Sequence, residues 1–460
     1  MVIKDAIQGS EYVKIMSFHV LDALICVDHE NFFMSQLQNR SFLRTCFTDI
    51  SNFSYQDAER GNLMGGGFSL DSMQRLCTLE AELSLLLRIS HKYGKSGSQL
   101  LFSMGSVQHI ALCRALHLPM KENIRHLDTG IQKRSVDYKQ RVVVAPTLRL
   151  LFSLTALVDG SEFFEVKNKV VREIIEFVRG HQLLFDQILR EDLSDGDEYT
   201  IELISLVVGI LSKVWPYEES DEYGFIQGLF GMMHALFSRG PDIFTSVRSE
   251  IQQKAGVSIS CLCFSLSSYL YFLVTKKSLR LHVSDGPAGY HEATALQQPT
   301  LVLLVIFLGS VATGLERATE EKYLLLNKIK DINELSRQEV DEIINLYVSQ
   351  DFAPSSENMQ HRRCTAMASM CHIVGHWSRV IILLLLLAQN LMNIILDHFQ
   401  DSAYGSSFDA KEDLPSLFGE LIPVLERLEI VSEDKTGHSL KVFRRLARSL
   451  KELSFLNLAT

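Results

Sequence analysis

The chain has 460 residues, of which 47% are hydrophobic and 22% are charged, and this composition excludes a disordered protein. Its 45 basic and 55 acidic residues give a formal net charge of -10, which argues against a nucleic-acid-binding surface that covers the whole protein. Eight scattered cysteines without a C-x-x-C pair are not the pattern of a disulfide scaffold or a zinc module, so we expect reduced core residues.

Apolar side chains recur at helical intervals from the first residues onward, and the alternation typical of a β-strand is almost absent. Stripes of this kind predict helices over residues 12–39, 71–93, 98–117 and 143–158. The segment 162–179 carries another apolar stripe, and Gly180 stands where a left-handed helix cap is expected. Residues 200–214 are apolar on nearly every face after Thr200, an expected N-cap, which predicts a helix packed between neighbours.

The segment KVWPYEESDEYGF, residues 213–225, places a cluster of carboxylates and aromatic rings beside a proline. Pro216 disfavours helical geometry at Trp215, so we expect the preceding helix to end there. Ser220 can then cap a following helix, with Asp221 in its first turn, where negative charge is favourable. We therefore interpret this segment as a corner between two helices and not as a catalytic or metal-binding pocket.

The second half of the chain continues the helical pattern. Further stripes predict helices over residues 221–238, 256–282, 301–330, 363–399, 414–430 and 439–455. Ser336 and Glu339 have the spacing of a capping box, which predicts the start of one more helix. Short corners without a fixed repeat period predict an all-α fold, namely an irregular α-solenoid: a HEAT/ARM-like superhelix of antiparallel helix pairs, running as a single continuous array over residues 1–460.

Two apolar stretches, 293–315 and 380–396, support an alternative in which the chain is a membrane-associated helical protein. A membrane-spanning helix needs about 20 mainly apolar residues. Two glutamines and Pro299 near the start of the first stretch leave roughly fifteen usable positions, and Gln389 interrupts the second. We therefore expect buried core helices and no transmembrane segment. The first 20 residues interrupt every apolar run, so we also expect no secretory signal.

Residues that could carry chemistry are sparse, so we predict no enzyme, no cofactor and no metal site. His372 and His376 have the i, i+4 spacing of a zinc helix, but Ile373 occupies the place of the general-base glutamate. A structural zinc site that adds Cys364 and Cys371 stays an alternative, although one straight helix cannot surround a zinc ion with four ligands.

The terminal helix pair, residues 414–455, is the most informative region for partner binding. The last helix has an apolar stripe that includes Leu440, Phe443 and Leu450, and basic residues cover its other faces. Such a helix can be a polar cap of the array, one wall of a groove for a partner's amphipathic helix, or a surface attracted to acidic lipid or nucleic acid. Pro423 is expected to kink the preceding helix and to open a cleft beside it.

Three long segments resemble a known family. They are GSQLLFSMGSVQHIALCRAL at 97–116, EFFEVKNKVVREIIEFVRGHQLLFDQILRED at 162–192, and LVVGILSKVWPYEESDEYGFIQGLFGMMHALF at 206–237. Together they are similar to the carboxy-terminal part of the largest inner-ring scaffold nucleoporins of the nuclear pore complex, the nucleoporin two-hundred-and-five class and its fungal counterparts. The resemblance is strongest over residues 80–240 and continues more weakly to Thr460.

This resemblance implies a non-catalytic α-solenoid that belongs to a large symmetric assembly at the nuclear envelope, supports nucleocytoplasmic transport and does not bind nucleic acid directly. Family members are several times longer, so the chain corresponds to a carboxy-terminal portion. The implied partners are other inner-ring nucleoporins and an amphipathic helix of a linker nucleoporin, which the family binds at its carboxy-terminal end. Carried onto this chain, that groove is expected to involve Leu417, Leu421, Ile430, Phe443 and Leu446.

Overall fold

Residues that the structure, a computed structural model, describes form helices joined by turns, and no strand occurs among them. They are residues 1–39, 41–53, 70–116, 140–160, 164–191, 198–215, 224–240, 250–277, 279–283, 298–347, 358–400, 413–431 and 433–458. The predicted all-α class is confirmed. The chain divides into two compact units, Met1–Tyr223 and Gly224–Thr460. Its arrangement as one continuous solenoid over 1–460 stays a prediction.

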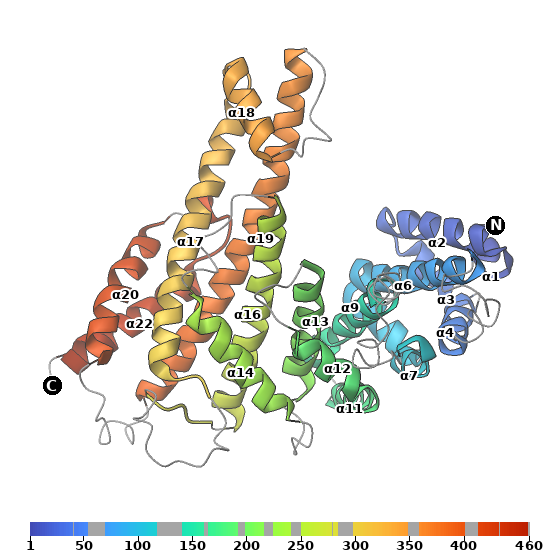
Figure 1. Cartoon of the computed structure of the whole chain (residues 1–460), viewed down its shortest axis with the longest axis horizontal. Coiled ribbons are helices and arrows are strands. Elements are labelled where there is room, and N and C mark those ends of the chain that lie inside the picture. Colours follow the sequence, from blue (N-terminus) through green and yellow to red (C-terminus); the bar gives the residue numbers. More distant parts are fainter. Residues whose placement is uncertain are drawn as a thin grey trace, which may run out of the picture. The chain divides into compact units, whose positions relative to one another are not determined.

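The first unit is built around α6, which packs against α2 and α9 (Figure 1). Its helices are α1 (Val2–Gln8), α2 (Glu11–Cys26), α3 (Phe32–Asn39), α4 (Phe42–Asn52), α6 (Leu70–Ser103), α7 (Ser106–Ala111), η1 (Arg114–Leu116), η3 (Gln140–Val144), α9 (Ala145–Leu154), α10 (Ala156–Gly160), α11 (Phe164–Gly180), α12 (Gln182–Leu189) and α13 (Glu198–Val214). Apolar residues from three of the stripes predicted for this half lie in the core: Leu148, Ile174 and Leu211 are among its fully buried residues.

A bend divides α6, because Gly94 adopts a left-handed φ of 56° inside it. The chain then folds back closely: a Cβ on Gly97 would lie 2.3 Å from the carbonyl oxygen of Ile89. A 2.7 Å hydrogen bond joins the buried hydroxyls of Ser90 and Ser98 across the bend. Glycine at position 97 is therefore required for this close approach of backbone to backbone.

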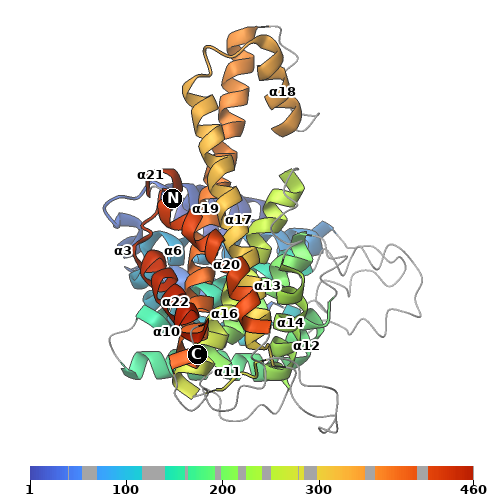
Figure 2. The same ribbon diagram turned by 90° about the vertical axis from the view of Figure 1, so that its left-hand side faces the viewer.

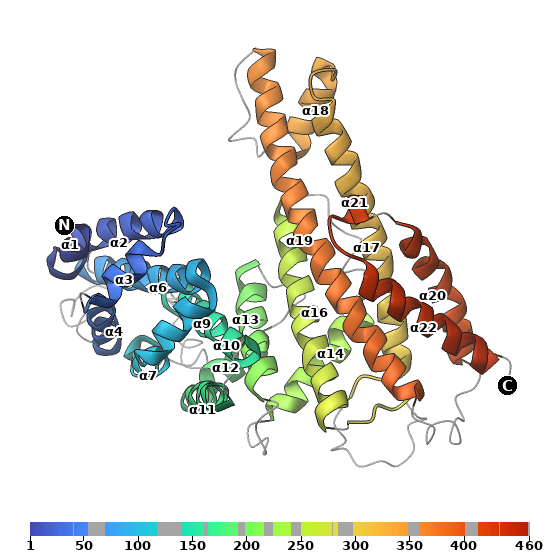
Figure 3. The same ribbon diagram turned by 180° about the vertical axis from the view of Figure 1, so that it is seen from behind.

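In the second unit, α17 and α19 run side by side, and α18 packs against α19 near one end of this pair (Figures 1 and 2). The helices of the unit are α14 (Phe225–Ser238), α16 (Glu250–Lys277), α17 (Leu301–Lys330), α18 (Arg337–Tyr347), α19 (Met359–Gln400), α20 (Asp413–Ile430), α21 (Glu433–Thr436) and α22 (Lys441–Leu458). The helix α16 packs on α19, and α20 and α22 cover α17 and α19 from another side (Figure 3).

Local signals explain several helix starts. The hydroxyl of Thr300 accepts a hydrogen bond from the backbone N–H of Leu303, which fixes the first turn of α17. The predicted capping box before α18 is confirmed, since the carboxylate of Glu339 accepts hydrogen bonds from the backbone N–H and the hydroxyl of Ser336 at 2.8 and 2.7 Å.

Three expected caps were wrong. The helix α14 begins at Phe225 and not at 221, and Gly224, with a φ of 68°, is its N-cap. The predicted cap Ser220 and Asp221 lie outside the described residues. Gly180 lies within α11 without a left-handed backbone, and Thr200 lies inside α13, which begins at Glu198. Capping preferences of about 1 kcal/mol are weak signals, and helix bounds read from them carry an error of one or two residues.

Among the described residues, four helical stretches are long and apolar enough to cross a membrane, judged by length and composition alone. They are Val142–Asp159, Val257–Lys276, Leu301–Lys330 and Met359–Phe399. The two stretches that raised the membrane alternative from sequence fall largely in the last two of these. Between 50% and 72% of the apolar windows in these helices is already buried inside the protein.

Candidate partner-binding site

The terminal helix α20 is fixed to the long helices by two contacts. Phe418 packs edge-on against Phe399 of α19, with ring centroids 5.8 Å apart. Arg427 donates two hydrogen bonds, at 2.6 and 3.1 Å, to the carboxylate of Glu316 on α17. A forked guanidinium–carboxylate pair defines orientation as well as distance. The helix α20 is therefore held in a defined position on its neighbours.

Besides its buried apolar stripe, the last helix, α22, uses basic residues to contact the end of α20. Arg444 donates to the backbone carbonyls of Glu429 and Val431, at 3.0 and 2.8 Å, where α20 ends. These carbonyls have no partner within their own helix, and the negative end of the helix dipole also attracts the cation. Lys451 lies 3.3 Å from the carboxylates of both Glu426 and Glu429. Part of the basic face predicted for this helix thus stabilises the helix pair itself.

A short helix that the sequence analysis missed, α21, connects this pair to α17. The ammonium group of Lys322 is buried and donates to the carbonyl of Thr436 at 2.9 Å. Burial lowers the pKa of Lys322, as expected for an ammonium group removed from water. Lys435 lies over the ring of Tyr323, 4.6 Å from its centroid. Two lysines therefore bind the turn to one face of α17.

The structure places the five predicted groove residues in different environments. Leu421, Phe443 and Leu446 are buried, with exposed fractions of 2%, 0% and 6%. Ile430 is 84% exposed at the end of α20. Leu417 lies in α20, but its side chain is outside the described part of the structure. Three of the five residues thus fill the packing of the helix pair, and Ile430 is available to a partner.

Exposed residues of α22 lie next to this core. Val442 is 45% exposed, and Lys441, Arg445 and Arg448 are also exposed. The three basic residues follow each other at i, i+4 and i+7, so they share one side of the helix. This combination offers an apolar contact flanked by positive charge, which suits an amphipathic helix with acidic flanks.

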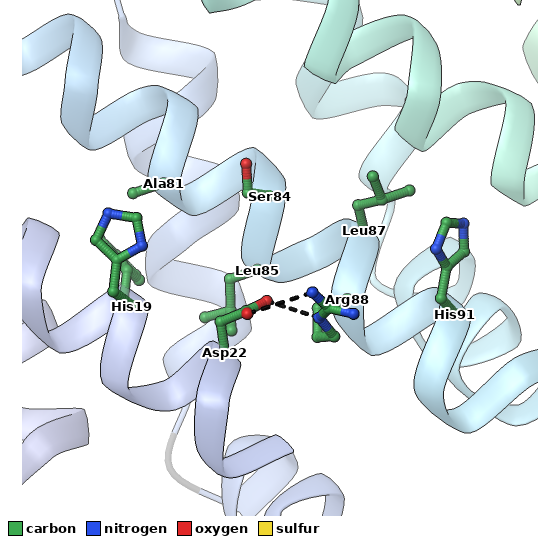
Figure 4. Close-up of a pocket in the computed structure, with 9 residues that line it drawn as sticks. His19, Asp22, Ala81, Ser84, Leu85, Leu87, Arg88 and His91 are labelled. Atoms are coloured by element: carbon green, nitrogen blue, oxygen red, sulfur yellow. Dashed lines mark hydrogen bonds and ion pairs between the residues drawn. The ribbon is translucent and has the colours of Figure 1, made fainter. Parts of the chain in front are cut away.

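A pocket of about 280 Å³ lies between α2 and α6 of the first unit (Figure 4). Its lining includes His19, Asp22, Leu85, Arg88 and His91. Arg88 donates to the carboxylate of Asp22 at 2.8 and 3.4 Å, so the two charged groups of the pocket satisfy each other. Burial and the charge of Arg88 lower the pKa of His91, which favours its neutral form. The carboxylate and the guanidinium of the pocket are therefore paired with each other.

Among the described residues, no group of three histidine, cysteine or acidic side chains lies close enough together to hold a metal ion. Cys364 and Cys371 are exposed, whereas His376 is buried and its pKa is lowered to about 4, mainly by burial. At the predicted corner, α13 ends at Val214 as expected, and Trp215 is buried with 1% exposure. The acidic residues 218–222 of that corner lie outside the described ranges.

A comparison with known proteins gives one strong similarity. The chain is 52% identical over 465 aligned positions to the Nuclear pore complex protein NUP205 of Arabidopsis thaliana. The alignment covers 99% of this chain and 24% of the relative, in its carboxy-terminal part. The resemblance to the nucleoporin two-hundred-and-five class is thereby confirmed, and the chain spans about a quarter of the length of the relative. No protein-family model matches the chain.

Proposed function

We propose that the chain is a structural component of the nuclear pore complex at the nuclear envelope. The observation that carries this proposal is the 52% identity over 99% of the chain to a protein named for that complex. Identity at this level extends over both compact units, so it concerns the whole described architecture and not one short motif. Long helices with extensive buried seams are also suited to a mechanical role.

The finer role is that of an inner-ring scaffold without catalytic activity, which contacts other nucleoporins through helical surfaces. The first turns of α22 support this role. Its exposed Val442 is flanked by Lys441, Arg445 and Arg448, and it receives an acidic amphipathic helix of a linker nucleoporin. Ile430, at the end of α20, belongs to the same docking surface. The buried Leu421, Phe443 and Leu446 support this surface from below.

Localisation tests the coarse proposal. The chain, fused to a fluorescent protein and expressed in Arabidopsis cells, is expected to give a punctate rim at the nuclear envelope. Affinity purification of the same fusion is expected to recover nucleoporins. A diffuse signal in the cytosol or the nucleoplasm, with no nucleoporin recovered, would contradict the proposal.

The docking proposal needs a separate measurement with purified protein. Replacing Arg445 and Arg448 by Glu is expected to weaken binding of an acidic amphipathic linker-nucleoporin peptide at least tenfold, because both charges would then repel its flanks. Arg190→Glu is the matched control, since Arg190 has a side chain 78% exposed on the first unit. Equal affinities of the double variant and the control would remove this surface as the site.

A membrane-associated function is a second candidate, because four helical stretches meet the length and composition of membrane spans. Purified chain that remains monodisperse without detergent and does not float with phosphatidylcholine and phosphatidylserine vesicles would eliminate this candidate. Flotation that resists high salt and alkaline carbonate would favour it over the pore scaffold.

A further inference from the structure

The amino-terminal end of α19 carries two exposed metal-ligating side chains on adjacent turns. His361 and Cys364 are both exposed, and they lie three residues apart in the helix that begins at Met359. Residues at i and i+3 of a helix share one side of it, with their Cβ atoms about 5–6 Å apart. The imidazole and the thiolate can therefore reach one metal ion together. We call these two residues the His361–Cys364 pair.

The pair is available to a ligand in the described part of the structure. No hydrogen bond or ion pair engages the imidazole of His361 or the thiol of Cys364 there, and only the backbone carbonyl of His361 is used, as the acceptor for the hydroxyl of Thr365. Core cysteines differ, because burial raises the pKa of Cys113 to about 11 and that of Cys263 to about 12. Such burial disfavours the thiolate that a metal ion requires.

Contacts of the neighbouring residues turn the pair away from its own unit. Arg362 donates to the carboxylate of Asp341 on α18 at 2.7 Å, and Arg363 donates to the carbonyl of Leu335, just before α18, at 3.0 Å. Ala366 is buried on the same side of α19. The pair lies on the opposite side, at an end of α19 that extends beyond α16, α20 and α22 (Figures 1 and 2). A second molecule can therefore approach it.

This combination of ligands occurs once among the described residues. Three cysteines are exposed, Cys26, Cys364 and Cys371. The histidine nearest to Cys26 in sequence, His29, lies beyond the end of α2. The histidine beside Cys371, His372, follows it directly, and consecutive residues point about 100° apart around a helix. Only Cys364 therefore has an exposed histidine on the adjacent turn of the same helix.

The chemistry of the pair favours zinc, and one chain supplies only half of a zinc site. Thiolate and imidazole are the usual ligands of structural zinc, which is surrounded tetrahedrally by four protein side chains. No group of three ligands lies together among the described residues of one chain. Cys371 cannot complete the site, because seven helical residues separate it from Cys364 by about 10 Å. Two further ligands must come from another molecule.

A second copy of this chain matches the half-site. Under twofold symmetry it presents the same pair, so two copies together offer two thiolates and two imidazoles to one ion. No exposed residue of α19 between Met359 and Ser378 is Asp, Glu, Lys or Arg, so this face brings no like charges together. Ala368, one turn beyond Cys364, is small and exposed, which permits a short distance between the helix axes.

The protein surface around the pair is too small to hold a dimer without the ion. The exposed residues from Gln360 to Ala368 extend over about 12 Å of a helix about 10 Å wide, which gives on the order of 120 Å². A stable contact between separate proteins buries about 800 Å² on each partner. The bonds to the metal must therefore provide most of the affinity, and we expect the contact to depend on zinc.

We propose that the His361–Cys364 pairs of two copies of this chain bind one Zn²⁺ ion between them and thereby join the projecting ends of their α19 helices. Each thiol releases its proton to water when it binds, and the ion stays Zn²⁺, so the step needs no oxidant or reductant. The proposal goes beyond the proposed pore function and does not depend on it, since it concerns a metal-dependent contact between copies.

Size-exclusion chromatography with light scattering tests the contact directly. The 460-residue chain is kept reduced with tris(2-carboxyethyl)phosphine, so that no disulfide can form. It is expected to have the mass of a monomer in the presence of EDTA and the mass of a dimer when Zn²⁺ is added at half the concentration of the chain. Native mass spectrometry of the dimer is expected to show one zinc ion for two chains.

Variants on one side of α19 separate the pair from its neighbours. Cys364→Ser and His361→Ala are each expected to raise the Zn²⁺ concentration for half-maximal dimerisation at least about tenfold, because each removes two of the four ligands. Cys371→Ser and His372→Ala are the matched controls, since both residues are exposed on the same side of the helix two turns further along, and they are expected to dimerise like the parent. All four variants are expected to keep the melting temperature of the parent in EDTA, because the substituted residues are exposed.

Co²⁺ in place of Zn²⁺ reports the ligands themselves. A tetrahedral Co²⁺ ion with thiolate ligands absorbs strongly in the visible range and shows sulfur-to-cobalt charge transfer. We expect both features with the parent and with Cys371→Ser, and neither with Cys364→Ser.

Three results would overturn the proposal. The first is a parent chain that stays monomeric in Zn²⁺. The second is a Cys364→Ser variant that dimerises with Zn²⁺ as readily as the parent, which would place the ion elsewhere. The third is a dimer that forms only without reductant and needs no zinc, which would assign Cys364 to a disulfide between copies. None of these measurements depends on localisation, which tests the pore function separately.

Discussion

Replacing Phe443 by alanine tests whether this residue belongs to the core of the second unit or to a groove for a partner. The side chain is fully buried on the inner face of α22. A buried phenylalanine removes at least about 150 Å² from water, which at about 25 cal/mol per Å² corresponds to about 4 kcal/mol. This agrees with the roughly 3–5 kcal/mol usually lost when a core phenylalanine becomes alanine. We therefore expect Phe443→Ala to destabilise the second unit by about that amount.

The two tryptophans allow each unit to be observed separately. Trp215 lies in the first unit and Trp377 in the second, so a Trp215→Phe background leaves Trp377 fluorescence as the reporter of the second unit. Urea unfolding in this background gives the free energy for Phe443→Ala. The control is Val442→Ala at the neighbouring, 45% exposed position, expected to change it by less than about 0.5 kcal/mol. If Phe443→Ala left the free energy of unfolding unchanged but abolished peptide binding, the burial argument would be refuted and Phe443 would belong to the partner groove.

Three further predictions concern the first unit. Gly97→Ala is expected to lower the free energy of unfolding by about 1–3 kcal/mol, because its Cβ would lie 2.3 Å from the carbonyl oxygen of Ile89 and the backbone must shift. Urea unfolding followed by Trp215 fluorescence in a Trp377→Phe background measures this loss. An unchanged unfolding midpoint would contradict the bend at α6. Trp215→Ala is expected to lower the free energy of unfolding by about 3–5 kcal/mol, as for a buried aromatic residue, measured by urea unfolding followed by circular dichroism. A loss below about 1 kcal/mol would contradict the burial of Trp215. Burial, reinforced by the charge of Asp49, raises the pKa of Glu82 well above its ordinary value of 4.5. The folded state therefore binds more protons than the unfolded state, and the free energy of unfolding falls as pH rises from about 4.5 through the raised pKa. Glu82→Gln is expected to abolish this fall and to raise the melting temperature at neutral pH, and an identical pH profile in the variant would count against it.

Helix positions could be predicted well because their signals are local. The bounds of α17, Leu301–Lys330, coincide with the predicted 301–330, since Thr300 caps the start and the apolar stripe continues through the helix. The short α21 was missed, because its four residues are too few to show a period. Its position depends on Lys322, which is 114 residues away in sequence. No local pattern could reveal that contact.

The candidate site stays a prediction, and the sequence could not separate its buried residues from its exposed ones, for a related physical reason. An apolar stripe identifies the face of a helix that must be covered, but not the element that covers it. Phe443 and Leu446 were expected to meet a partner, and α19 and α20 pack on α22 instead. Val13 and Met16 lie in the helix that an apolar stripe predicted over residues 12–39, and they are exposed. The two stripes look alike in sequence and differ only in the neighbours that tertiary packing supplies.

The charged partners of a helix therefore indicate its environment better than its apolar length. The helix α17 is long and apolar enough for a membrane, yet Glu316 lies within it and forms a forked ion pair with Arg427 of α20. Inserting α17 into a bilayer would either break this pair or place both charges in hydrocarbon, and each charge there costs several kcal/mol. Packing against α20 in water satisfies Glu316 at no such cost. The same reasoning applies to α2, whose charged residues contact α4 and α6 and so indicate its packing inside the first unit.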